Sequence, residues 1–231
     1  MSNPYILLWL EAPLQSWGFE SKFSRRDSLY FPTKSAIMGL LCCALGYSGE
    51  QKEFLSKFMN LDMQVYSYVP EKTGAQPMLT DFHMVGSGYN KEDPWQKMQI
   101  PKTIESKPAV GGGAKLTYRY YLQDVSFAVL LQVPENELTN IENHLQYPIW
   151  DLFLGRKNCA PTEKIYNGHF GNYEEARNMG DAIAVKKLLK PHLEVLQGTL
   201  ENFRHIILND VPVIFGNSKK YKDRKVSYRY V

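Results

Sequence analysis

The feature that most constrains the fold of this chain is the segment at residues 31–46, FPTKSAIMGLLCCALG. Residues 36–38 and 40–45 are all apolar, so a helix formed here must be covered by other structure on every side. Thr33 is placed to cap the start of that helix, and Gly46 is placed to end it. Lys34 falls in the first turn, where the helix dipole disfavours a cation. We therefore expect a negatively charged group close to this end of the helix.

The composition is that of a folded soluble protein, because 44% of the 231 residues are hydrophobic and 22% are charged. The apolar run at residues 5–10 is too short to cross a membrane, and the N-terminus lacks the pattern of a signal peptide. The three cysteines suggest neither a disulfide framework nor a zinc site, and the histidines show no metal-binding spacing. We expect a cytoplasmic protein with no cofactor, no metal and no membrane association.

Positive charge is concentrated at the C-terminus. The net charge of the whole chain is only +3, yet residues 217–231 carry six Lys or Arg side chains against one Asp. Tyrosines alternate with these cations, a pattern that suits nucleic-acid binding. A solvated edge hairpin protected by lysines explains the same pattern equally well.

Hydrophobic periodicity predicts an α+β fold. Strands are expected at residues 5–10, 63–69 and 125–133, and helices at 34–45, 51–59 and 134–145. This order gives most of a ferredoxin-like (RRM-like) βαββαβ unit. We assign residues 1–168 to this core. Residues 169–231 should form a small, mostly β C-terminal subdomain with the basic tail, including strands at 205–208 and 226–231.

An insertion of about forty residues, from about 80 to 123, separates the second and third strands and is far longer than a hairpin needs. Its aromatic residues argue against simple disorder, so we expect a projecting thumb that touches a partner. Residues 111–117, GGGAKLT, resemble a phosphate-binding loop only superficially, because Ala114 precedes Lys115 and a strand-like run follows. A flexible hairpin tip is the better interpretation.

Two further sets of residues carry candidate chemistry. Asp81 and His83 should share one face of a strand, as a proton-transfer pair or a structural hydrogen bond. The turn at residues 154–161, LGRKNCAP, combines a glycine with two cations and suits a loop around phosphate. Together with Arg25, Arg26 and Lys34, it predicts two cationic patches.

Several separate stretches resemble one known family in the same order. They are LEAPLQSWG at 10–18, FPTKS at 31–35, DFH at 81–83, YRYYLQDVSF at 118–127 and LGRKNCAPT at 154–162. These motifs are similar to those of the CasD subunits of type I-E CRISPR Cascade, members of the Cas-five family of RAMP-like proteins that bind the 5′ handle of crRNA. The resemblance covers nearly the whole chain. It departs in a longer, glycine-containing insertion and a more basic tail.

The resemblance implies a non-catalytic Cascade subunit that caps the crRNA 5′ handle in antiviral defence. Its thumb would cross the guide and contact the backbone subunit, and another face would meet the large PAM-reading subunit and, indirectly, target DNA. The residues implied in RNA binding are Gln15, Trp17, Arg25, Arg26, Lys34, Ser35, His83, Lys115, Tyr118, Arg119, Arg156 and Lys157. Lys34 would meet a handle phosphate. Trp17 or Tyr118 would stack on an unpaired base, although core packing accounts for Trp17 equally well.

The alternative is a metal-independent endoribonuclease that processes precursor crRNA, as in the related type I-C branch. Proteins of that branch look like enzymes that use a tyrosine after the first helix together with a lysine–histidine pair. Tyr47 and Lys115 are available here, but Leu116 stands where the histidine is wanted. His83 can substitute only if the thumb folds back onto it.

Overall fold

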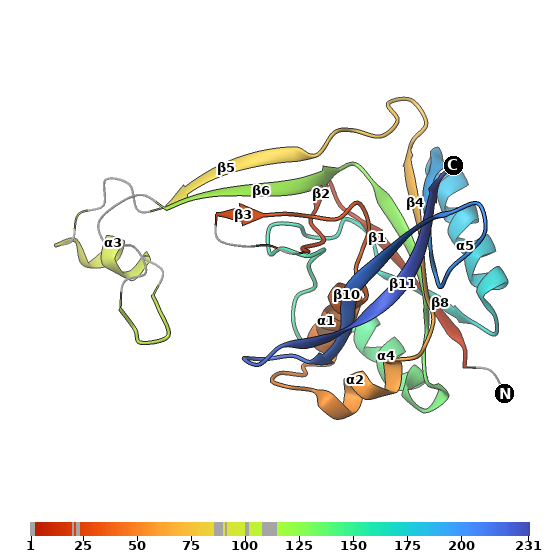
Figure 1. The fold of residues 1–231 in the computed structure, drawn as a ribbon, viewed down its shortest axis with the longest axis horizontal. Coiled ribbons are helices and arrows are strands. Elements are labelled where there is room, and N and C mark those ends of the chain that lie inside the picture. Colours follow the sequence, from red (N-terminus) through yellow and green to blue (C-terminus); the bar gives the residue numbers. More distant parts are fainter. Residues whose placement is uncertain are drawn as a thin grey trace.

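The computed structural model describes residues 3–19, 21, 24–85, 90, 92–99, 102–107 and 115–231. Its central element is an antiparallel sheet of seven strands in the order β10-β11-β9-β4-β7-β1-β8 (Figure 1). The strands are β1 Tyr5–Glu11, β2 Leu14–Gln15, β3 Arg25–Arg26, β4 Met63–Pro70, β5 Leu79–Val85, β6 Lys115–Gln123, β7 Ser126–Gln132, β8 Tyr166–Phe170, β9 Leu189–Gln197, β10 Arg204–Ile214 and β11 Lys220–Tyr230. The helices are α1 Lys34–Ala44, α2 Lys52–Phe58, α3 Pro94–Gln99, α4 Glu135–Gln146 and α5 Tyr173–Lys186.

The elements predicted before residue 150 are confirmed, each with ends within one residue of the expected bounds. Thr33 caps α1 by accepting the Ala36 N–H, and Gly46 follows the helix with a φ of +70°. No helix in the described ranges is both long and apolar enough to cross a membrane. The protein is therefore a mixed α+β structure built mainly on antiparallel strands.

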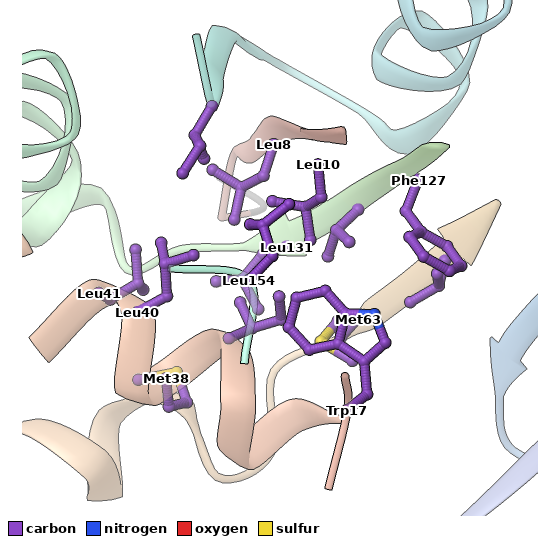
Figure 2. Close-up of a cluster of buried hydrophobic side chains, with 14 of the residues drawn as sticks. Leu8, Leu10, Trp17, Met38, Leu40, Leu41, Met63, Phe127, Leu131 and Leu154 are labelled. Carbon is purple, nitrogen blue, oxygen red and sulfur yellow. The ribbon is translucent and has the colours of Figure 1, made fainter. Parts of the chain in front are cut away.

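Helices cover both faces of the large sheet, which explains why its middle strands are apolar on both sides. Ile6 and Leu8 of β1 pack in one buried cluster with Ile37 and Leu41 of α1. Figure 2 shows Met38, Leu40 and Leu41 of α1 in this cluster. Leu7 and Trp9 belong to a second buried cluster on the opposite face, together with Ala176 and Ala184 of α5. The all-round apolar surface of α1 is thus enclosed, as its sequence requires.

The insertion forms a projecting hairpin, as predicted. Strands β5 and β6 pair antiparallel from Leu79↔Tyr121 to Val85↔Lys115. Figure 1 shows this ribbon extending away from the body, with α3 beyond its outer end. The glycine segment expected at the hairpin tip, residues 111–114, lies outside the described residues.

The C-terminal strands extend the first sheet, contrary to the predicted separate subdomain after residue 168. Strand β9 pairs with the edge of β4, where Val65 faces Val195, and β11 and β10 follow outward. Helix α5 packs beneath the same sheet. The predicted boundary therefore does not correspond to a break in the structure, because the open edge of β4 is completed by the C-terminal third of the chain.

Replacing residues 97–114 by a short Gly-Ser linker should leave the body folded. None of the described residues in this stretch is buried, and all seven strands of the large sheet lie elsewhere. We expect a thermal midpoint within about 2 °C of the native value, because changes at exposed positions remain small. A thermal melt followed by circular dichroism checks this. A loss of about 10 °C would mean that the outer hairpin stabilises the body.

Candidate nucleic-acid interface

The negative group expected at the start of α1 comes from the chain itself. Oδ2 of Asp210 on β10 accepts the Lys34 backbone N–H at 2.8 Å. Arg224 of β11 donates two hydrogen bonds to the same carboxylate, at 3.0 and 2.7 Å. Asp210 and Arg224 are both buried. The first turn of α1 is thus neutralised by an internal carboxylate rather than by a bound anion.

The Lys34 side chain also points inward, which corrects its predicted contact with RNA phosphate. Lys34 is 0% exposed, and its ammonium donates to the carbonyl oxygens of Leu61 and Met59, just past the end of α2. Burial lowers the pKa of Lys34 to about 8. A fully enclosed ammonium cannot reach a ligand on the surface, so Lys34 ties α1 to α2 instead.

Gln15 and Trp17 are likewise interior residues, contrary to their predicted place in an RNA site. Gln15 Nε2 donates to the Val125 carbonyl at 2.6 Å, and the side chain is fully buried. The Trp17 indole packs edge-on against Phe127, with ring centroids 6.3 Å apart, in the cluster seen in Figure 2. Core packing, the alternative left open for Trp17, is the one observed. Both residues fix the segment that leads toward β3.

Two adjacent arginines are placed beside the hairpin by a short parallel pairing. In β3, Arg25 lies opposite Tyr118 of β6, and Arg26 lies opposite Arg119. The Tyr118 N–H also donates to the Ser24 carbonyl at 2.8 Å. Both β3 residues are exposed. The pairing therefore places three arginines along the middle of the ribbon, with Arg25 on one face and Arg26 and Arg119 on the other.

The Arg25 guanidinium rests against an aromatic ring. Its Nη2 donates to the Tyr120 hydroxyl at 3.0 Å, and its Cζ lies 5.4 Å from the centre of that ring. Asp27 is 3.6 Å away, but the Arg25 side chain is 62% exposed, so this pair contributes little stability. The ring orients the guanidinium while leaving most of it free to meet an anion.

The predicted phosphate loop at residues 154–161 is held against the segment before β3 by Gly155. Its φ is +95°, and a Cβ atom there would lie 1.7 Å from the Ser16 carbonyl oxygen. Only glycine permits this approach. The Ser16 N–H donates to the Leu154 carbonyl at 3.2 Å, which fixes the same contact.

The loop presents Arg156 directly to β3. Its Nη2 donates to the Arg26 carbonyl at 2.7 Å, and its guanidinium lies over the Tyr121 ring at 4.6 Å. Asn158 donates to the Tyr121 hydroxyl at 3.2 Å. The cations of the loop and of β3, predicted as two patches, therefore adjoin through the β3 backbone, without Lys34, while Arg25 and Arg156 lie against rings on opposite faces of β6. We call this set the basic surface: Arg25, Arg26, Arg119, Arg156 and Lys157.

The predicted site also includes three hairpin residues outside this set, which are His83, Tyr118 and Lys115. His83 and Asp81 share one strand face with Nδ1 and Oδ2 4.0 Å apart, and both are about two-fifths exposed. At this distance they do not form the structural hydrogen bond with each other that was considered from sequence. Tyr118 is 43% exposed and packs on Phe82, with ring centroids 5.3 Å apart. Lys115 begins β6 at the outer end of the ribbon.

The remaining candidates lie around α1. The Ser35 hydroxyl is 3.1 Å from Thr33 Oγ1 and lines a surface cleft. Tyr47 packs edge-on against Phe54 of α2, with centroids 5.2 Å apart. Tyr47 therefore belongs to the body, whereas Lys115 and His83 lie on the projecting ribbon (Figure 1). Throughout the described ranges, no three His, Cys, Asp or Glu side chains gather as metal ligands.

Sequence reasoning missed the residues that support the site. Tyr120 and Tyr121 each carry an arginine on the ring. The run YRYYLQ predicted a strand, and its alternation could have assigned these rings to opposite faces. Asp210 and Arg224 left no local signal, because their roles depend on contacts with a segment 176 residues away.

Comparison with known proteins places the chain among the CRISPR-associated proteins. Residues 5–229 match the family described as CRISPR-associated protein (Cas_Cas5). Because the match spans nearly the whole sequence, the chain belongs to the Cas5 family, and the resemblance seen in the sequence motifs is confirmed.

Individual relatives agree with this assignment. The chain is 27% identical over 174 residues to the CRISPR system Cascade subunit CasD of Escherichia coli (strain K12), covering 71% of this chain and 70% of the relative. The fold is similar to a chain of a CRISPR RNA-guided surveillance complex, with a TM-score of 0.69 and 23% identity over 98% of this chain and 90% of that one. A second similar structure is the crystal structure of a Cas protein, with a TM-score of 0.62 and 23% identity over 98% and 94% of the two chains.

Replacing Lys34 by Glu should lower the free energy of unfolding by about 3–5 kcal/mol, because the new carboxylate would be buried against the Leu61 and Met59 carbonyl oxygens, which accept hydrogen bonds and cannot donate them. The helix dipole alone would favour Glu, but only by about 0.3–1 kcal/mol. Urea denaturation measures the difference. An unchanged or raised unfolding midpoint would contradict the internal role of Lys34.

The matched control is Lys34→Met, which removes the charge and keeps an unbranched side chain. Because the folded pKa of Lys34 is lowered to about 8 from 10.5, the unfolded chain binds the proton more tightly. As the pH rises from 7.5 to 9.5, the free energy of unfolding of the native protein should therefore increase by about 1–2 kcal/mol relative to that of Lys34→Met. Parallel pH profiles of the two proteins would contradict the lowered pKa.

Proposed function

We propose that this protein is a Cascade subunit that caps the 5′ handle of crRNA on its basic surface. The observation that carries the proposal is that Arg25, Arg26 and Arg156 all lie around the β3–β6 pairing of the hairpin. These side chains come from distant parts of the sequence, and 130 residues separate Arg156 from Arg26. The E. coli relative is named as a Cascade subunit, which supports the same assignment.

The chemistry of the basic surface suits a single RNA strand. Planar guanidinium groups bind phosphate oxygens in pairs, and they do so without reading sequence. The exposed Tyr118 ring adjoins Arg25 in the β3–β6 pairing and offers a surface on which an unpaired base stacks. Cations for the backbone and an aromatic ring for a base are the two components of single-strand recognition.

We infer that the core of the sheet is ferredoxin-like (RRM-like). Two units, β1–α1–β4 and β7–α4–β8, place their strands in the order β4-β7-β1-β8, all antiparallel to their neighbours. Each helix connects two strands that have a third strand between them in the sheet. This is the βαββαβ topology of that fold class, with the hairpin inserted between its second and third strands.

The hairpin is the part of the molecule suited to partner subunits. One face of the ribbon carries the cross-strand pairs Phe82–Tyr118 and Met84–Leu116, and all four side chains are at least 40% exposed. A two-stranded ribbon is marginally stable alone, so an apolar face of this kind gains from being covered. In this proposal the hairpin crosses the guide and packs against the backbone subunit, while the body meets the large PAM-reading subunit and, through it, target DNA.

The endoribonuclease alternative gains no support from the arrangement of its residues. Cleavage without a metal needs a base, an acid and a cation around one phosphate. Tyr47 packs against Phe54 in the body, while His83 lies on the projecting ribbon beside Asp81. We therefore propose a binding subunit rather than an enzyme.

Changing Arg25 and Arg26 together to Ala should weaken binding of a single-stranded repeat RNA. Each lost phosphate contact should reduce the log–log salt slope of affinity by about 0.7. Titration of the full chain at several salt concentrations measures both quantities. The control is Lys186→Ala, at an exposed position of α5 on the opposite face of the sheet. Equal affinities and slopes for the native protein and the double variant would exclude this surface.

Purified protein incubated with repeat RNA and a chelator should leave the RNA intact. The measurement is gel analysis of end-labelled RNA after prolonged incubation. Cuts at a defined position that carry a cyclic phosphate, and that disappear in Tyr47→Phe, would contradict the binding role and favour the endoribonuclease.

A further inference from the structure

A cleft beside the start of α1 is not explained by the basic surface. Its volume is about 570 Å³, and its lining includes Phe19, Ser35, Lys219 and Tyr221. A neighbouring hollow of about 390 Å³ shares Ser35, Lys219 and Tyr221 and extends the space along α1. Clefts of this size accommodate small organic groups such as one nucleotide.

The charge in this cleft is positive and largely uncompensated. Lys219 is exposed and forms no ion pair with any residue in the described ranges. The acidic residue in the lining is Asp210, whose carboxylate is already bound by Arg224 and the Lys34 N–H. Asp223, on the same hairpin as Lys219, accepts a hydrogen bond from Asn209 at 2.6 Å. An anion entering the cleft therefore meets a free ammonium and a neutralised carboxylate.

The walls supply the other contacts that a nucleotide requires. Tyr221 and Phe19 are half-buried aromatic residues in the lining, and Phe19 also packs against the hydrophobic core. Burial raises the pKa of the Tyr221 hydroxyl, so it remains a donor at neutral pH. The Ser35 hydroxyl, 3.1 Å from Thr33 Oγ1, offers a polar partner for a sugar.

The cleft is close to the basic surface along the chain. Ser21 lines the cleft, and Arg25 begins β3 four residues later. Their Cα atoms are thus at most about 14 Å apart even if the intervening chain is fully extended. A single strand bound by Arg25 and Arg26 can therefore continue into the cleft.

We propose that this cleft binds one nucleotide of single-stranded RNA, with Tyr221 stacking on the base and Lys219 contacting a phosphate. The proposal rests on the proposed function, because the strand is the one held by the basic surface. It gives the basic C-terminal hairpin a direct role in binding RNA. The competing interpretation of those lysines, a solvated edge that only discourages aggregation, predicts no contact with RNA.

The test is a fluorescence-anisotropy titration of the full chain with single-stranded repeat RNA across a salt series. Lys219→Glu should weaken binding at least threefold and reduce the salt slope by about 0.7. Tyr221→Leu should weaken binding at least about fivefold without changing the slope, whereas Tyr221→Phe keeps the ring and should bind nearly as the native protein does. Lys186→Glu on α5 makes the same charge change on the other face and should have the smaller effect.

The outcomes separate this proposal from the function on which it rests. If Lys219→Glu matches Lys186→Glu and Tyr221→Leu binds as the native protein, while the Arg25 and Arg26 variant still loses affinity, the cleft proposal is overturned and the RNA-binding function stands. If all of these variants bind RNA as the native protein does, both fail. If Lys219→Glu weakens binding of duplex DNA only, the assignment to RNA is overturned. A thermal melt of each variant verifies that it is folded.

Discussion

The buried carboxylate of Asp210 organises the side of the molecule where nucleic acid is expected to bind. It accepts the first N–H of α1 and two hydrogen bonds from Arg224, so it joins the earliest helix to the last two strands. Removing one partner of such a buried pair leaves an uncompensated charge and costs far more than the pair contributes. Lys34 then fixes the far end of the same region by donating to the carbonyls after α2. These buried hydrogen bonds consequently hold the elements that line the cleft, including the hairpin that carries Lys219.

The basic surface depends on backbone contacts more than on charge. Arg25 and Arg26 are positioned by two residue pairs with β6, and Arg156 is positioned by a loop that only a glycine allows to approach Ser16. Tyr120 and Tyr121 then hold two of the guanidinium groups by their rings. Preorganised cations lose less side-chain entropy when a phosphate binds than freely rotating ones do. The arginines of the basic surface are therefore preorganised for a ligand.

How far the sequence could predict this structure depended on the distance over which each residue finds its partner. The three strands and three helices predicted before residue 150 were predictable because periodicity and caps are local signals, whereas the short elements β2, β3 and α3 were not predicted. The inward orientation of Lys34 was not, because Asp210 lies 176 residues away and the dipole argument could not tell an internal anion from a bound one. The same limitation explains the C-terminal strands. Strands were predicted within β10 and β11, but β9 was not predicted as a strand, nor was it predicted to complete the edge of β4.

The parallel pairing of β3 with β6 couples the orientation of the hairpin to the positions of the arginines. The strand that carries the ribbon outward is the same strand that sets the spacing of Arg25, Arg26 and Arg119 midway along it (Figure 1). A force that tilts the outer end of the ribbon must therefore shift the arginines or break the Tyr118–Ser24 hydrogen bond. If a partner binds the outer end of the ribbon and RNA binds the arginines, the two binding equilibria would be thermodynamically linked through this strand.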